Sequence, residues 1–155
     1  MRIPRIYTAQ ELGPGVTLLL EPEPSHHLIR VLRIASGDAL VLFNGTGGEY
    51  PATVSSVDKK QVAVRTGDLN ETDRESPLHI HLGIAISRGD RMDWIVQKST
   101  ELGVSAITPL FTEHTNVKLA GERAQKRLRH WRQIAISACE QCGRNRLPAV
   151  PAPQT

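Results

Sequence analysis

The sequence predicts two domains of different class, a small β-barrel or sandwich followed by an incomplete α/β domain with a parallel sheet. Three observations predict this. The first seventy residues hold short apolar or alternating runs separated by turn residues, residues 67–77 are almost devoid of apolar side chains, and strand and helix patterns alternate after Pro77. A chain of 155 residues is long enough for one ordinary core or two small ones.

The first domain is predicted to be built mainly of strands. Turn chemistry at Gly37-Asp38 and Asn44-Gly45 separates apolar runs, as expected for hairpins. The loop after Asn44 contains Gly-Thr-Gly-Gly but lacks the Lys-Ser/Thr of a phosphate-binding loop, which favours a hairpin. The predicted strands are 16–20, 39–43, 50–57 and 61–66.

One helix is expected to interrupt these strands. Ser25 is a suitable N-cap, and Leu28, Val31 and Leu32 recur at helical spacing, which predicts that they face the core. Arg30 and Arg33 would then lie on the outer face of the helix.

The polar run from Gly67 to Pro77 predicts a solvated linker. We therefore expect a β-domain over 1–72, a linker over 73–77 and the α/β part over 78–155.

The second part shows a β-α-β-α pattern, with strands around 79–86 and 104–111 and helices around 91–102 and 121–142. Such a pattern implies a parallel sheet whose ligand site lies at the carboxyl ends of the strands. Asp90 is the expected N-cap of the first helix, and Gly103 and Gly143 are the expected C-terminal stops. Leu102 is expected in the buried stripe, and a third strand interrupted by prolines is expected after Leu147.

Charge is distributed unevenly along the chain. Residues 1–76 hold 8 Lys/Arg against 10 Asp/Glu, whereas residues 77–155 hold 11 against 6. The basic second half, above all residues 118–146, predicts a polyanionic partner. No run is long and apolar enough to span a bilayer, no signal peptide is recognisable, and two cysteines make no disulfide framework, so a cytoplasmic protein is expected.

The two cysteines also raise the alternative of a metal or redox site. Cys139 and Cys142 are three residues apart, and His79 and His81 alternate on a predicted strand. A redox Cys-x-x-Cys is expected to begin a helix, whereas this pair ends one, and a tight-turn ligand pair is lacking. We therefore expect no metal site.

The segment from Glu140 to Arg146 is the strongest candidate for chemistry, because two arginines follow the end of the last helix and are expected near the carboxyl edge of the sheet. Guanidinium groups suit a phosphate or a developing imide anion. An equally good interpretation is that Arg144 and Arg146 complement the helix C-terminus, a contribution of roughly 0.3–1 kcal/mol each.

Two further sets of basic residues are candidates for contact with an RNA backbone. The alternatives are a scattered solvated surface for the first set and an ordinary amphipathic helix for the second. The first set is Arg2, Arg5, Arg30 and Arg33, and the second is Arg123, Lys126 and Arg127.

Several stretches resemble one family. Met1-Arg-Ile-Pro-Arg-Ile-Tyr, His27-Leu-Ile-Arg-Val-Leu-Arg and Phe43-Asn-Gly-Thr-Gly-Gly-Glu-Tyr look like the N-terminal domain of RsmE ribosomal RNA methyltransferases. Ser87-Arg-Gly-Asp-Arg-Met-Asp-Trp, Gln97-Lys-Ser-Thr-Glu-Leu-Gly-Val, Pro109-Leu-Phe-Thr-Glu and Ala138-Cys-Glu-Gln-Cys-Gly-Arg-Asn-Arg-Leu-Pro are similar to the stretches that follow. The resemblance runs in order from residue 1 to about 150.

The resemblance implies a PUA-like RNA-binding domain, then a SPOUT-class methyltransferase domain that methylates N3 of a uridine in 16S ribosomal RNA with S-adenosylmethionine, as a homodimer. It makes Arg2, Arg5, Arg30 and Arg33 candidates for RNA contact. It also places Glu140, Arg144, Asn145 and Arg146 at the rim of the reaction centre.

The chain departs from the family at its end. The family's Gly-Pro-Glu-Gly-Gly segment and its later Leu-Arg-Thr-Glu-Thr stretch, which form the knot that holds the cofactor, do not occur in this sequence. We therefore expect RNA docking without cofactor binding or catalysis by this chain alone. The alternative is a freestanding RNA-binding module without enzymatic activity.

Overall fold

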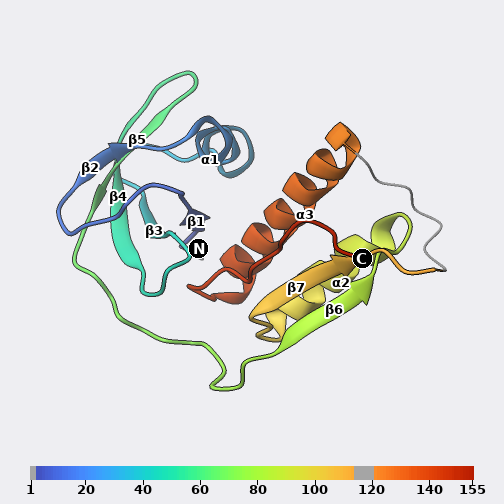
Figure 1. Cartoon of the computed structure of the whole chain (residues 1–155). Helices are drawn as coiled ribbons and strands as arrows, with labels where there is room; N and C mark the ends of the chain where they lie inside the picture. Colours follow the sequence, from blue (N-terminus) through green and yellow to red (C-terminus); the bar gives the residue numbers. More distant parts are fainter. Residues whose placement is uncertain (1–2, 114–120) are drawn as a thin grey trace. The chain divides into compact units, whose positions relative to one another are not determined.

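The computed structural model describes residues 3–113 and 121–155, which form two compact units, Met1–Arg74 and Glu75–Thr155 (Figure 1). Each unit has its own hydrophobic core. Within the described residues, no helix has the length and apolar character needed to cross a membrane.

The first unit is a five-stranded sheet in the order β1-β3-β4-β5-β2. All pairs are antiparallel except β1 with β3, which is parallel. The four predicted strands are present, but β1 was not predicted, because its place in the sheet comes from pairing with the distant β3 rather than from a local pattern. The strands are β1 (Arg5–Tyr7), β2 (Thr17–Leu19), β3 (Ala39–Phe43), β4 (Tyr50–Val57) and β5 (Val62–Thr66).

Alternation along the strands builds the core of this unit. Leu40 and Leu42 of β3 and Val62 and Val64 of β5 are buried on one face of the sheet. Each buried aliphatic side chain of this size contributes about 1.5–3 kcal/mol. The Asn44–Glu49 stretch connects β3 to its antiparallel neighbour β4, as the hairpin prediction required.

The helical segment differs from its prediction. Helix α1 (Pro22–His27) begins before Ser25, and a π-helical turn, η1 (Leu28–Leu32), continues it. Ser25 is no cap: it is buried, donates to the carbonyl oxygen of Leu20 and accepts from the backbone N–H of Val62. Leu28 is buried as predicted, but Val31 and Leu32 are exposed.

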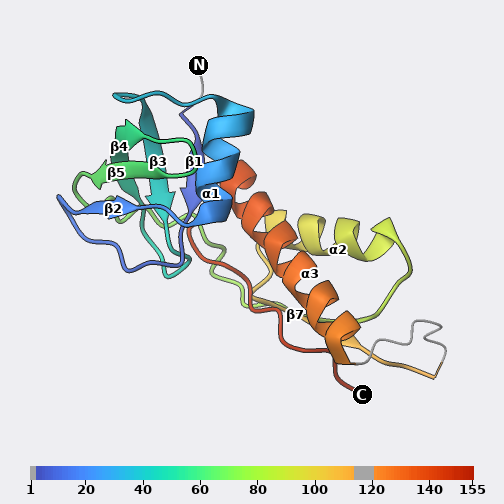
Figure 2. The same cartoon turned by 90° about the horizontal axis from the view of Figure 1, so that it is seen from above.

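The second unit has the predicted β-α-β-α order (Figure 1), and its two helices lie beside each other (Figure 2). Strands β6 (His81–Ala85) and β7 (Ala106–Leu110) pair in parallel, and helices α2 (Asp90–Glu101) and α3 (Gly121–Cys142) pack against each other. Trp131 of α3 is buried with Met92 and Val96 of α2 and Ile107 of β7 in one cluster. Both helices therefore cover the same face of the sheet.

The C-terminal segment lies along the free edge of β7. Ala149 pairs with Ala106 and Gln154 with Leu110, both in parallel, through backbone hydrogen bonds of 2.7–3.0 Å. Pro151 and Pro153 lie between these two bridges and lack the N–H that a continuous ladder needs. The expected third strand is therefore present as two isolated bridges.

The bounds of α3 and the glycines at both helix C-termini agree with the prediction, whereas the N-cap of α2 does not. Gly103 and Gly143 have φ values of 94° and 92°, a left-handed conformation that glycine adopts without strain. At the start of α2, Gly89 occupies the N-cap position and Asp90 is the first helical residue, so the predicted cap is wrong by one residue. Leu102, predicted to be buried, is exposed because it follows the last turn of α2.

Candidate functional site

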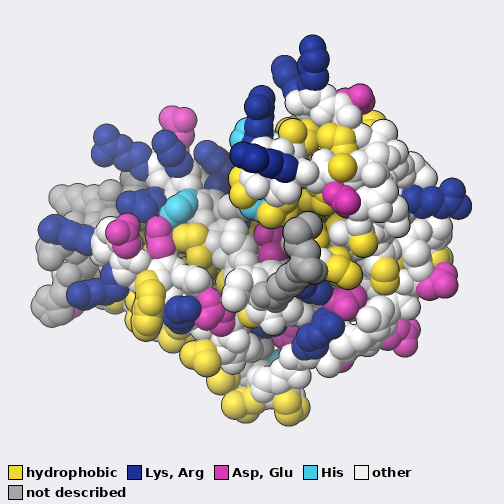
Figure 3. All heavy atoms as spheres, turned by 180° about the vertical axis from the view of Figure 1, so that it is seen from behind, with side chains coloured by type: hydrophobic (Ala, Val, Ile, Leu, Met, Phe, Trp, Pro, Cys, Tyr) yellow, Lys and Arg dark blue, Asp and Glu magenta, His cyan; other side chains and the backbone are white. Residues whose placement is uncertain are grey.

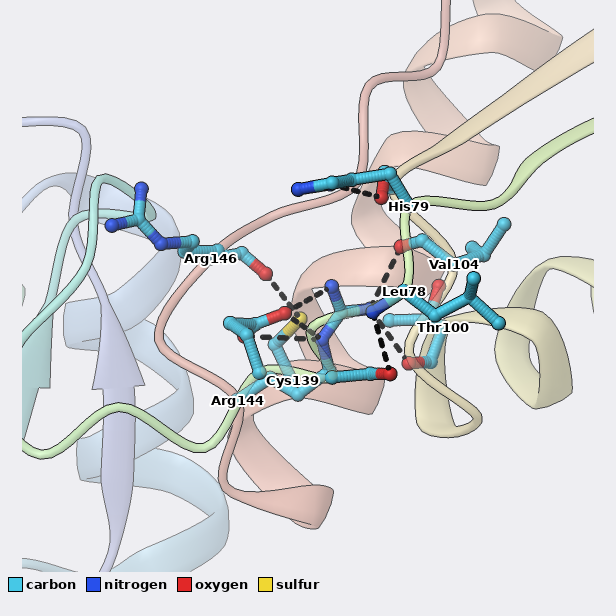
Figure 4. A network of polar contacts seen from close by, with 10 residues as sticks. Leu78, His79, Thr100, Val104, Cys139, Arg144 and Arg146 are labelled. Carbon is cyan, nitrogen blue, oxygen red and sulfur yellow. Dashed lines mark hydrogen bonds and ion pairs between the residues drawn. The ribbon is translucent and has the colours of Figure 1, made fainter.

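The end of α3 and the loop that follows it contain the residues predicted for the reaction centre, and Arg144 is their most buried cation. Its Nε and Nη2 donate to the Glu75 carboxylate at 2.6–3.2 Å (Figure 4). Its Nη1 donates to the carbonyl oxygens of Thr100 at 2.8 Å and Val104 at 3.1 Å. Because Thr100 lies in the last turn of α2, Arg144 neutralises the partial negative charge at the end of that helix.

This network lies at the amino end of the sheet. Val104 lies two residues before β7, and Ala149, just after the loop, pairs with Ala106 at the start of that strand. The placement of Arg144 and Arg146 near the carboxyl edge was therefore wrong. A helix that connects parallel strands runs back along them, so the residues after its C-terminus lie at the amino edge.

The other residues of this loop have different surroundings. Arg146 is exposed, and its side chain extends away from the Arg144 network (Figure 4). Its backbone is held, because the buried Cys139 thiol donates to the Arg146 carbonyl oxygen at 3.6 Å. Asn145 is buried and Glu140 is half-buried. The catalytic roles of Arg144, Arg146 and Glu140 stay predictions.

Glu49 is the centre of a second ionic cluster, in the first unit. Arg74 donates to both of its carboxylate oxygens, at 2.8 and 3.0 Å, and Arg5 donates to one of them. Hydrogen bonds from Arg74, and then from Arg5, hold the pKa of Glu49 at about 2, although burial acts to raise it. The Arg5 guanidinium also lies over the Phe43 ring, 5.0 Å from its centroid. Arg5, predicted to contact RNA, therefore has its charge engaged within the unit.

Arg30 and Arg33 are exposed, as predicted. Arg33 has φ 52° and ψ 43°, and it is the one described non-glycine residue with positive φ. Arg2 lies outside the described residues.

Helix α3 exposes the second predicted basic set. Arg123, Lys126 and Arg127 are exposed in its first half, and Figure 3 shows Lys and Arg side chains gathered there. Further along α3, a groove of about 320 Å³ is lined by both helices. Beside it, His130 of α3 pairs with Asp93 of α2 at 2.7 Å. The groove residues are Gln97, His130, Gln133, Ile134, Ser137, Ala138 and Gln141.

Neither ionic cluster was predicted from the sequence. Glu49, Arg74 and Glu75 are 25 to 69 residues from their partners. Charges so far apart show no periodic signal, and Arg74 and Glu75 lie in the stretch expected to be a solvated linker.

The described residues do not form a recognisable cradle for a methyl-donor cofactor. Among the described residues of the second unit, two buried side-chain polar atoms lack a hydrogen bond, Asp93 Oδ1 and Trp131 Nε1. Both belong to the helices rather than to the carboxyl edge of the sheet, where a nucleotide-like ligand is expected.

Known families match both units in order. Residues 20–66 match an RNA methyltransferase PUA domain, and residues 74–155 match an RNA methyltransferase domain. The chain is 39% identical to ribosomal RNA small subunit methyltransferase E of Buchnera aphidicola over 98% of its own length and 60% of that protein.

Solved structures agree with this match. A putative methyltransferase from Legionella pneumophila, in complex with SAM, is 49% identical with a TM-score of 0.96. Ribosomal RNA small subunit methyltransferase E from Neisseria gonorrhoeae, bound to S-adenosyl methionine, is 43% identical with a TM-score of 0.94. Each covers 99% of this chain, which spans 63% of each of them.

The expected fold, a PUA-like β-domain followed by part of a SPOUT-type α/β domain, is therefore confirmed. The chain belongs to the RsmE family of ribosomal RNA methyltransferases and comprises its PUA domain and the N-terminal part of its methyltransferase domain.

Proposed function

We propose that this chain supplies RNA docking and the first part of the catalytic domain to an enzyme that methylates N3 of a uridine in 16S ribosomal RNA with S-adenosylmethionine. The observation that carries the proposal is the order of the two family matches, RNA methyltransferase PUA domain and then RNA methyltransferase domain. The similarity to small-subunit methyltransferases supports the choice of RNA.

The chemistry sets what the protein must do. N3 of uridine lies on the Watson–Crick edge and carries a proton, so the base must be unpaired before it is attacked. As the proton leaves, negative charge spreads onto the two carbonyl oxygens of the base. A positioned cation that contacts one of them stabilises that state.

Two exposed basic surfaces are assigned to RNA docking. The first is Arg30 and Arg33 in the β-domain of residues 1–72, and the second is Arg123, Lys126 and Arg127 on α3. Acidic partners at helical spacing are scarce on α3, where Glu122 is the one acid between Gly121 and Arg132. Arg5 is assigned a structural role in the first unit rather than a direct RNA contact, because its guanidinium pairs with Glu49 and lies over the Phe43 ring.

In the loop after α3, Arg146 is the residue assigned to the substrate, because its side chain is exposed on a fixed backbone. Arg144 is assigned a positioning role through Glu75 and the end of α2. Glu140, half-buried at the end of α3, is the candidate for the proton acceptor.

Self-association through the second unit completes the proposal. Trp94 and Leu102 are 61% and 83% exposed on or beside α2, and large exposed apolar side chains are typical of contact surfaces. Sedimentation velocity of the wild-type chain and of Trp94→Gln tests this, and an unchanged monomer in both would contradict it.

The function is tested by filter binding of 16S ribosomal RNA across a salt series, beside calorimetric titration with S-adenosylmethionine. We expect RNA binding that weakens steeply with salt, without cofactor binding by this chain. The whole protein, with the remaining family segment fused to Thr155, is expected to methylate the RNA. Absence of RNA binding at low salt would overturn the docking role, and cofactor binding by the chain alone would move the cofactor site into residues 75–155.

A further inference from the structure

The first unit exposes two large apolar side chains between two arginines. Val31 is 63% exposed and Leu32 is 41% exposed, and Arg30 and Arg33 flank them. Because the two are adjacent and lie between charged residues, they form a small apolar patch with a polar rim, as contact surfaces do.

The backbone accounts for their direction. The turn η1 is π-helical, and the N–H groups of Arg33 and Ile34 both reach back to the carbonyl oxygen of Leu28. A regular α-helix would bring Val31 or Leu32 back to the side of the buried Leu28, whereas this wider turn leaves both facing outward.

This turn also ends in an unfavourable conformation. Arg33 adopts the left-handed region at φ 52°, where the Cβ of an L-residue crowds the backbone. Single π-turns and left-handed non-glycine residues cost conformational free energy, and they are concentrated at functional sites.

The charged side chains around the π-turn η1 are all basic. From His26 to Gly37 the sequence contains Arg30, Arg33 and two exposed histidines, and no aspartate or glutamate. The nearest acid after the turn, Asp38, accepts a hydrogen bond from the backbone N–H of Ala35 at 2.7 Å. A polyanion with apolar faces complements such a surface.

We propose that residues 30–33 bind unpaired nucleotides of RNA, with Arg30 and Arg33 on phosphates and Val31 and Leu32 against exposed base faces. The proposal rests on the RNA docking proposed above and names the form of RNA that this surface takes. Paired bases in an A-form helix hide their faces in the stack, whereas unpaired bases present them to apolar side chains.

The test uses a fluorescein-labelled single-stranded RNA of twelve nucleotides and the blunt duplex made from it, with the 155-residue chain. The double variant Val31→Ser/Leu32→Ser is expected to bind the single strand about tenfold more weakly, with an unchanged salt slope and unchanged duplex affinity. Leu19→Ser is the matched control, because Leu19 is 55% exposed on β2 of the same unit. It should bind as the wild type does.

The two arginines are tested by the salt dependence of RNA binding. Arg30→Gln and Arg33→Gln are each expected to lower the slope of log affinity against log salt by about 1. Arg33→Gly should weaken RNA binding without lowering the unfolding midpoint, because glycine accepts the left-handed conformation. This variant separates loss of contact from loss of fold.

The outcomes distinguish the two proposals. If the arginine variants weaken binding and the Val31/Leu32 variant does not, the base contact is overturned and RNA docking stands. Equal weakening for the single strand and the duplex also overturns the base contact. If the wild-type chain binds neither RNA at low salt, the docking function itself is overturned.

Discussion

Arg74 and Glu75 are adjacent in the chain, yet each forms its ion pair inside a different compact unit. Arg74 donates to Glu49 at 2.8 Å in the first unit, and Glu75 accepts from Arg144 at 2.6 Å in the second. The polypeptide is thus attached on both sides of the boundary between the units. This arrangement predicts that removing either partner destabilises one unit and spares the other.

Glu75→Gln should destabilise the second unit by about 3 kcal/mol, because it leaves the Arg144 guanidinium buried without its counter-charge. Both tryptophans, Trp94 and Trp131, lie in this unit, so tryptophan fluorescence during urea unfolding reports it alone. Arg74→Gln is the matched control and should leave the tryptophan transition in place. A shift of equal size in both variants would contradict the separate roles of the two pairs.

Arg144→Lys should also lower the stability of the second unit, although the charge is kept. One ammonium group cannot reproduce the forked contacts that Arg144 makes with Glu75 and with the carbonyl oxygens of Thr100 and Val104. We expect a loss of about 2 kcal/mol by the same fluorescence measurement. Arg146→Lys, an exposed change two residues later, should cost less than about 0.5 kcal/mol.

The Glu49 cluster predicts acid sensitivity of the first unit. Hydrogen bonds from Arg74 and Arg5 hold the pKa of Glu49 at about 2 in the folded protein, below the usual 4.5 of a glutamate. A lowered folded-state pKa contributes stability that is fully present above about pH 4.5 and is lost as the pH falls towards 2. The difference sets an upper bound of about 3 kcal/mol, which solvent screening of the partly exposed ion pair reduces.

Hydrogen exchange of β1 and β4 between pH 5 and pH 2.5 measures this loss. Glu49→Gln should be less stable than the wild type at pH 6 and should show a flatter pH dependence of the free energy of unfolding. Parallel pH profiles for the two proteins would show that another group is responsible.

Gly103→Ala should destabilise the second unit by about 1 kcal/mol. Gly103 has φ 94°, and an added Cβ would meet only the Ser76 Cβ at 3.6 Å, so the cost is conformational rather than steric. Gly83→Ala on β6 is the comparison, because Gly83 does not have positive φ and its new Cβ would approach the flexible end of Leu110. A larger loss for Gly83→Ala, measured by tryptophan fluorescence, would refute this.

Local patterns determined much of this protein from the sequence alone. The alternation in β3 to β5, the helical spacing in α3 and the glycines at 103 and 143 each depend on neighbours a few residues away, and each is where it was predicted. The sequence also determined the family, because its motifs resemble RsmE enzymes in order along nearly the whole chain.

Tertiary structure decided the rest, because it depends on contacts between residues distant in the chain. Only the fold pairs Arg144 with Glu75 and Arg5 with Glu49. The residue predicted for catalysis is thus a buried cation with a partner, and the one predicted for RNA contact is a half-buried cation with a partner. Only the fold replaces the expected α-helical turn with a π-turn that exposes Val31 and Leu32, because the core around Leu28 sets its geometry. Spacing along a sequence predicts which residues share a face, but the partner across that face is chosen by packing.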